Sequence, residues 1–133
     1  YGADYGGDVF IRCMMSKDEA TGSVAMATNI NEGSDFWVTR RDTEKMKQAA
    51  KQTAFNVLNR LNGKTPKFVL HIECDGRGKM VLPETDKQAM IAIMQETIGR
   101  DIPWIGLYAY GEVCPIKDHN CLHGFAGVLS VVC

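Results

Sequence analysis

Two β-rich runs separated by a helical pattern restrict the fold of this chain more than any other feature. The first run is 68–74 (Phe-Val-Leu-His-Ile-Glu-Cys), the second is 102–110, and a helix is expected between them, from 83 or 85 to 98. A connection of this length favours a right-handed crossover, so the two strands should lie parallel in one sheet. Thr85 and Gln88 have the spacing of a capping box at the start of the helix. The residues expected to face the core are Met90, Ile91, Ile93, Met94 and Ile98.

Another helix is predicted before this unit, from Asp42 to about Asn62. Asp42 is a favourable N-cap residue, Gly63 suits the left-handed position after the last turn, and Pro66 prevents easy continuation. The apolar positions recur at helical spacing, which predicts an amphipathic helix packed on the core. These positions are Met46, Ala49, Ala50, Ala54, Val57, Leu58 and Leu61.

The remaining β-rich runs complete an α+β domain. Runs 9–15 and 23–30 flank a turn and predict an antiparallel hairpin, and 36–40 predicts a third strand of the same meander. The final run, 124–132, should form an antiparallel pair with 102–110. The order βββ-α-β-α-ββ therefore predicts a mixed, mainly antiparallel sheet with two helices on one face.

Length and composition indicate one globular domain. The chain has 133 residues, 45% hydrophobic and 23% charged, so we expect a flexible lead-in at 1–7 and a single domain at 8–133. A net charge of −1, without a run of Lys or Arg, argues against nucleic acid or an anionic membrane as a partner. No signal peptide or membrane-spanning run is recognised, so the expected location is the cytoplasm. The odd number of cysteines, five, favours reduced thiols over a disulfide scaffold.

The side chains suited to chemistry gather where the predicted strands end. Parallel strands bring their carboxyl ends to the same edge of a sheet, and open α/β sheets usually bind ligands at that edge. The last strand runs back from this edge and should bring a histidine to it. The candidate ligand-binding residues at this edge are Cys74, Gly76, Arg77, Tyr110, Gly111, Glu112 and His123.

Arg77 and Glu112 suggest what such a site would hold. Arg77 lies between two glycines and could bind a carboxylate bidentately. Glu112 could accept an amine, so the two residues together suit a zwitterion. A salt bridge between Arg77 and Glu112 would explain both residues without a ligand. Packing within the sheet is the favoured explanation of Tyr108 and Tyr110, although the hydroxyl of Tyr110 should lie close to this edge.

The same edge of the sheet allows two other kinds of site. Cys74 can be a small buried apolar residue or a thiol nucleophile, with Arg77 favouring the thiolate and the adjacent acids opposing it. The loop after Glu112 holds four side chains of metal-ligand type, Cys114, His119, Cys121 and His123. Their spacing fits no standard zinc module, so neither a metal nor another cofactor is expected. The rivals to ligand sensing are therefore a thiol-dependent enzyme or redox switch centred on Cys74, and a purely structural interaction module.

Several of these segments resemble the C-terminal FIST domain. The most specific are Cys74-x-Gly-Arg77 and Tyr108-x-x-Gly-Glu112, and the likeness spans nearly the whole chain. Further matches in the right order are Ile11-Arg12, Glu32-Gly33, Gly106, Pro115 and His123. The family usually has Phe-His-Asn near the end, where this chain has Leu122-His123-Gly124.

The resemblance implies a cytoplasmic sensory module of signal transduction. Such a module would bind a small molecule, such as an amino acid, and pass the signal to an attached or partner output domain. Arg12 joins the expected ligand-binding residues because it belongs to the matching segments. The resemblance also implies an N-terminal FIST half in the intact protein, which would share the ligand site, and it implies no catalysis.

Overall fold

The computed structural model describes residues 11–79, 81–116 and 119–133. The predicted lead-in at 1–7 and the start of the first predicted strand lie outside the described residues. The described elements are β1 (Met14–Asp18), β2 (Ser23–Met26), α1 (Thr43–Leu61), β3 (Phe68–Cys74), the short 3-10 helix η1 (Asp75–Arg77), α2 (Glu84–Ile98), β4 (Trp104–Ala109), β5 (Glu112–Ile116), β6 (His119–His123) and β7 (Gly127–Val132).

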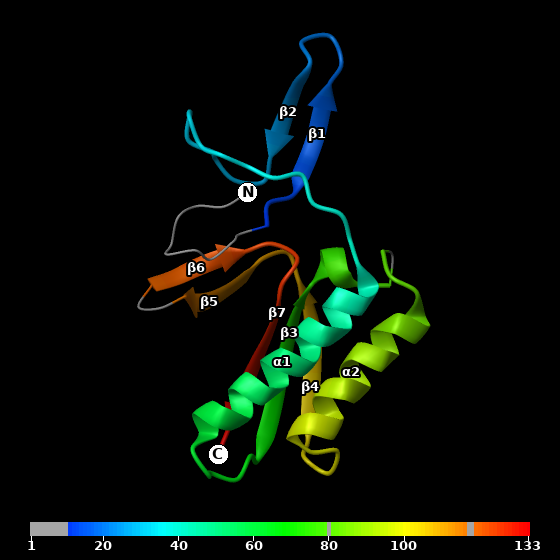
Figure 1. Cartoon of the computed structure of the whole chain (residues 1–133), viewed down its shortest axis with the longest axis vertical. Coiled ribbons are helices and arrows are strands. Elements are labelled where there is room, and N and C mark those ends of the chain that lie inside the picture. Colours follow the sequence, from blue (N-terminus) through cyan, green and yellow to red (C-terminus); the bar gives the residue numbers. More distant parts are fainter. Residues whose placement is uncertain (1–10, 80, 117–118) are drawn as a thin grey trace.

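A three-stranded sheet in the order β4-β3-β7 forms the centre of the fold. β3 runs parallel to β4 and pairs Val69 with Trp104, as the strand-helix-strand unit predicts. β7 runs antiparallel to β3 and pairs Val132 with Phe68. Both helices lie on one face of this sheet (Figure 1), which confirms the predicted α+β class. The predicted N-terminal hairpin is present as β1-β2, and it stands away from the central sheet.

Three details of the predicted topology are wrong. The final strand pairs with β3 and not with β4, because the chain crosses the end of the sheet before β7 begins. The run 112–123, expected to turn from strand to loop, forms the separate antiparallel hairpin β5-β6. The run 36–40 is not a strand: Phe36, Trp37 and Val38 are exposed, and no described strand pairs with this segment. A strand without a hydrogen-bonded neighbour gains nothing from an extended backbone.

The ends of α1 follow the sequence closely, whereas the start of α2 does not. The side chain of Asp42 accepts a hydrogen bond from the backbone N–H of Lys45 at 3.1 Å, which makes it the N-cap. Asn62 and Gly63 both adopt positive φ, so the left-handed end of α1 falls where a glycine was expected. In α2 the predicted capping box is absent, because the N-cap is Pro83 and Thr85 already lies inside the helix.

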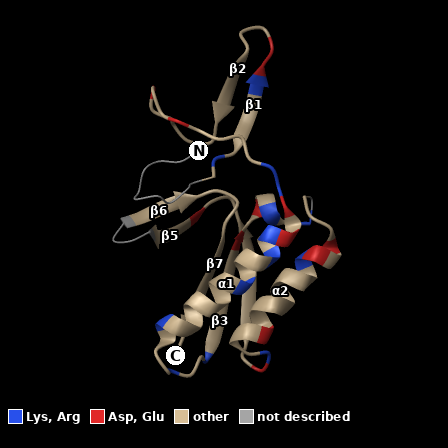
Figure 2. Cartoon of the chain, in the orientation of Figure 1, with Lys and Arg blue, Asp and Glu red and all other residues tan. Residues whose placement is uncertain are grey.

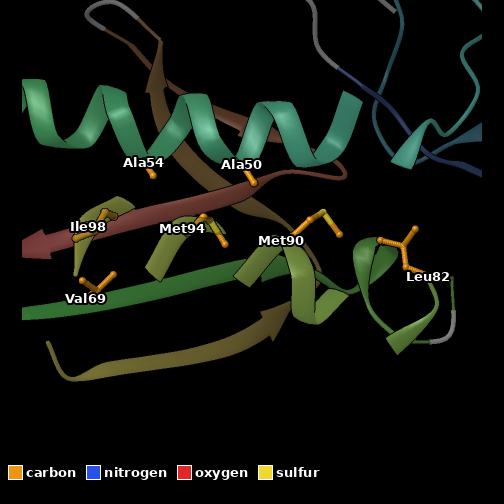
Figure 3. Close-up of a cluster of buried hydrophobic side chains, with 7 residues drawn as sticks. All are labelled: Ala50, Ala54, Val69, Leu82, Met90, Met94 and Ile98. Carbon is orange, nitrogen blue, oxygen red and sulfur yellow. The ribbon is translucent and has the colours of Figure 1, made fainter. Parts of the chain in front are cut away.

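The core lies between the helices and one face of the sheet. Its seven buried apolar residues are Ala50, Ala54, Val69, Leu82, Met90, Met94 and Ile98. Figure 3 shows the two small alanines of α1 facing the methionines of α2. The predicted inward position Ile93 is only partly buried. Lys87, one turn before Met90, is buried on the inner face of α2 instead.

The opposite face of the sheet is apolar but uncovered. Successive β3 residues point to alternate faces, so Val69 faces the helices while Leu70 and Ile72 face away from them. In register beside these two lie Ile105, which is 55% exposed, and Leu107, which is 51% exposed. No element within the described ranges packs on this face. Neither described helix combines the length and the apolarity that crossing a membrane requires.

Candidate functional site

One wall of a hollow is formed by the ends of β3 and β4 together with β5 and β6. β3 and β4 end level with one another, since Cys74 pairs with Ala109. The chain then turns through Gly111 into β5, where Glu112 pairs with His123 of β6. The hollow has a volume of about 570 Å³. Of the residues predicted from the sequence, it is lined by Arg12, Cys74, Gly76, Tyr110, Gly111 and His123.

The facing wall comes from segments that the sequence did not assign to a site. It includes Met26, Ala27 and Thr28 at the end of the β1-β2 hairpin, and Phe125 between β6 and β7. Phe125 has φ of +54°, which is unusual for a bulky residue. A positive φ cannot be read from one sequence, so Phe125 carried no signal beyond its aromatic side chain.

Gly76 is required at the base of this hollow. A Cβ added at Gly76 would lie 2.4 Å from Cε1 and 2.6 Å from Cδ1 of Phe125, closer than carbon atoms approach without displacement. The glycine therefore lets η1 lie directly under the aromatic ring. Phe125 is thus the group that approaches the backbone at Gly76.

Arg77 does not line this hollow, because its side chain is held behind it. Its Nε donates to Oε1 of Glu73 at 3.0 Å, and its Nη1 donates to the carbonyl oxygen of Phe125 at 3.5 Å. The ion pair of Arg77 is therefore with Glu73 in β3 and not with Glu112, which was the alternative explanation of both residues. Arg77 instead borders a second hollow, which shares Phe125 with the first.

Glu112 is buried directly behind the wall of the hollow. It is 1% exposed, and neither carboxylate oxygen has a partner with hydrogen-bond geometry among the described residues. Burial raises the pKa of Glu112 above its ordinary value. The backbone N–H of Ala126 and the thiol of Cys74 lie close enough to offset only part of that rise. Glu112 is therefore a carboxylate whose charge this fold does not fully stabilise.

A second group of buried polar residues lies under α2. Oε2 of Glu73 forms an ion pair with Lys87, so one carboxylate serves both Lys87 and Arg77. Lys87 also lies 5.5 Å from the centre of the Tyr108 ring. Burial lowers the pKa of Lys87 to about 8. Burial, together with the charges of Lys87 and Arg77, lowers the pKa of neighbouring His71 to about 4, which leaves that imidazole neutral at pH 7.

The sequence contained a signal for this buried cluster that the predicted site did not use. Lys87 lies three residues before Met90 and seven before Met94, so it shares the core-facing side of α2. His71 and Glu73 alternate in phase with Val69, which places them on the helix-facing side of β3. A charge on each of two inward faces predicts a buried ion pair.

The Cys-rich hairpin brings its thiols close together. Cys114 and Cys121 are direct partners in the β5-β6 ladder. Burial, followed by the neighbouring Cys121, raises the pKa of Cys114. Nε2 of His123 lies 3.3 Å from the carbonyl oxygen of Cys114. None of the five cysteines forms a disulfide, and no group of three metal-ligating side chains is close enough to hold an ion within the described ranges.

Comparison with known proteins identifies the family. The sequence profile of the FIST C domain matches residues 2–115, so the chain belongs to this family of signal-transduction sensory domains, as its motifs suggest. An uncharacterised protein of Mycobacterium bovis is 30% identical over 125 residues, which cover 94% of this chain and 31% of the relative. An uncharacterised protein of Mycobacterium tuberculosis is 28% identical over 125 residues, or 94% of this chain and 32% of the relative. The chain thus spans about a third of the length of these curated relatives. No solved structure gives a significant match.

Proposed function

We propose that the hollow at the strand ends is the ligand site of a sensory domain. The observation that carries the proposal is Glu112, a buried carboxylate without a hydrogen-bond partner in the described part of the chain. Three of its neighbours line the hollow: Gly111 in the chain, His123 across the hairpin, and Cys74. A volume of about 570 Å³ lies in the usual range for small-molecule sites.

A ligand with an amino group suits this arrangement. A cation beside Glu112 would supply the hydrogen bonds and the charge that its carboxylate lacks. The carboxylate of an amino acid would be held by Arg12, which lines the hollow and whose Nη1 also donates to the carbonyl oxygen of Leu122 at 3.1 Å. Glu112 is buried in this state, so contact with the ligand requires its side chain to turn toward the hollow. That movement would couple binding to a change in the β5-β6 hairpin, which is what a sensor needs.

The test is a thermal-shift screen of the amino acids on the intact protein, followed by calorimetric titration of any binder. We expect at least one saturable binder, with affinity reduced about tenfold or more by Glu112→Gln because the charge-assisted bond is lost. Glu84→Gln, on the exposed start of α2, is the matched control and should bind normally. Absence of any binder, or equal affinity in Glu112→Gln, would reject the proposal.

A thiol-dependent enzyme or redox switch is the rival function, and the surroundings of Cys74 weigh against it. Cys74 is partly buried, which limits the access of a reagent to its thiol. We therefore expect iodoacetamide to alkylate Cys74 more slowly than the exposed Cys133 at pH 7, as measured by peptide mass spectrometry. Preferential alkylation of Cys74 would favour the rival function.

We infer that the uncovered apolar face of the sheet packs against the rest of a longer protein. The relatives contain about twice as much additional chain as the part that matches, and an N-terminal FIST half is the expected occupant. A signalling output domain and a cytoplasmic location are further predictions from the resemblance to the FIST family. The face itself demands an apolar partner surface, because Ile105, Leu107 and Val132 are each more than half exposed.

This partner can be tested with one substitution. Leu107→Lys should leave residues 1–133 folded, because the side chain is already exposed, but should destabilise the intact protein by about 1–3 kcal/mol. The measurement is urea unfolding of both forms, with sedimentation of residues 1–133 as a second readout. If residues 1–133 instead form a dimer that Leu107→Lys dissociates, the face belongs to a second copy and the inference is wrong.

A further inference from the structure

A second hollow shares Ile11, Arg12, Cys13 and Phe125 with the first, and five of its lining residues are basic. Its volume is about 510 Å³. The basic residues of its wall are Arg12, Arg40, Arg41, Lys45 and Arg77, and the acidic residue among its lining is Asp42. Figure 2 shows the basic segment that leads into the start of α1. Cations from three stretches of the chain therefore meet around one small space.

The charged residues that line the hollow carry a net positive charge, since five are basic and one is acidic. Asp42 is engaged as the N-cap, accepting from the backbone N–H of Lys45. Among the residues that the structure describes, no carboxylate forms an ion pair with Arg40, Arg41 or Lys45. The positive end of the α1 dipole adds to the field at the same place. An anion in this hollow would therefore be attracted from several directions.

Arg77 adds to the positive charge even though it has an ion-pair partner. Its partner Glu73 is shared with Lys87, so the three side chains together carry one net positive charge. Burial lowers the pKa of Arg77, but a guanidinium keeps its proton at physiological pH.

Arg41 is already fixed at the rim. Its Nη2 donates to the carbonyl oxygen of Gly76 at 3.4 Å, and its guanidinium carbon lies 5.8 Å from the centre of the Phe125 ring. These contacts use one of the donors of the planar fork, and the others remain for a ligand. A side chain held in place before binding loses less entropy when the ligand arrives.

We propose that this second hollow binds a small organic phosphate. Its phosphate would be held by Arg41 and Lys45, and its carbon portion would lie against Met14, Met46 and Phe125, which also line the hollow. A dianion with several oxygens balances more of the clustered cations than a single carboxylate does, and guanidinium groups match its geometry. This site is separate from the proposed amino-acid site, although Ile11, Arg12, Cys13 and Phe125 border both hollows.

The experiment titrates the intact protein with phenyl phosphate, inorganic phosphate and benzoate by calorimetry at constant ionic strength. We expect phenyl phosphate to bind saturably and at least about tenfold more tightly than benzoate. Lys45→Gln should weaken phenyl phosphate about tenfold, and so should Arg41→Gln. Lys51→Gln is the matched control, because Lys51 is an exposed lysine of the same helix outside the hollow. Circular dichroism verifies that each variant is folded. If Arg41→Gln does not fold, the comparison of Lys45→Gln with Lys51→Gln is sufficient to test the site.

Three results would overturn the proposal: no saturable binding of phenyl phosphate, equal weakening by Lys45→Gln and Lys51→Gln, or tighter binding of a single-stranded oligonucleotide than of phenyl phosphate. Tighter binding of the oligonucleotide would indicate that the basic hollow binds nucleic acid. Amino-acid binding in the first hollow is tested separately by Glu112→Gln, which should leave the affinity for phenyl phosphate unchanged. Failure of one site is thus distinguishable from failure of the other.

Discussion

Replacing Glu73 by Gln is expected to lower the free energy of unfolding by about 3–5 kcal/mol, because it leaves buried cations without their shared carboxylate. The side chains of Lys87 and Arg77 are 3% and 15% exposed, and Glu73 contacts both of them. Water cannot replace the lost charge at such depth. Urea unfolding at pH 7, followed by circular dichroism, measures the change.

The same unfolding experiment, applied to further variants, separates the effect of an unpaired buried charge from the effect of losing a side chain. Lys87→Met should lower the free energy of unfolding by less than Glu73→Gln does, since Glu73 would still have Arg77 as a partner. The double variant should be more stable than the sum of the single effects predicts, because the buried charge of Lys87 is removed together with its partner. Glu96→Gln is the surface control: its pair with Arg100 is exposed, and the expected change is within about 0.5 kcal/mol. Equal losses in Glu73→Gln and Glu96→Gln would contradict the buried network.

Glu112→Gln is expected to stabilise the protein at neutral pH. The pKa of Glu112 is raised in the folded state, mainly by burial, so ionisation of this carboxylate destabilises the fold. The destabilisation is absent below the unfolded pKa of about 4.5 and grows as the pH rises toward the folded pKa, by about 1.4 kcal/mol for each unit of elevation. The variant should therefore gain stability relative to the wild type as the pH increases from 4 to 7.

Unfolding measured at half-unit intervals of pH tests this expectation. Glu84→Gln provides a control of opposite sign, because hydrogen bonds from Gln88 and Lys79 lower the pKa of the exposed Glu84. Glu84 therefore contributes stability above the unfolded pKa that is lost as the pH falls. A difference between wild type and Glu112→Gln that does not change with pH, or that follows the direction of the Glu84 control, would disprove the interpretation of Glu112.

The elements with strong local signals could be predicted from the sequence. α1 has a side-chain cap at Asp42, a helical apolar pattern, and a left-handed end at Asn62 and Gly63, so its ends fall within a residue of expectation. The parallel pairing of β3 and β4 followed from the length of the connection between them. That pairing in turn placed Cys74 and Gly111 at one end of the sheet, which is the basis of the candidate site.

The features that depend on distant segments could not be predicted in the same way. The choice of β3 as the neighbour of β7 depends on where the β5-β6 hairpin carries the chain, and local pattern does not encode that path. Arg77 was expected near Glu112 because both follow parallel strands. Glu73 is four residues away and competes more effectively for the same guanidinium. When several acids lie near one basic side chain, the sequence alone does not show which acid pairs with it.

The strand order β4-β3-β7 has a consequence for how this sheet can be extended. Both outer strands lack a paired neighbour among the described residues, so each presents a row of backbone N–H and C=O groups. An added strand on either side would continue the hydrogen-bonded ladder and widen the apolar face of the sheet. The sheet of this chain is thus a nucleus onto which further strands can be built at both edges.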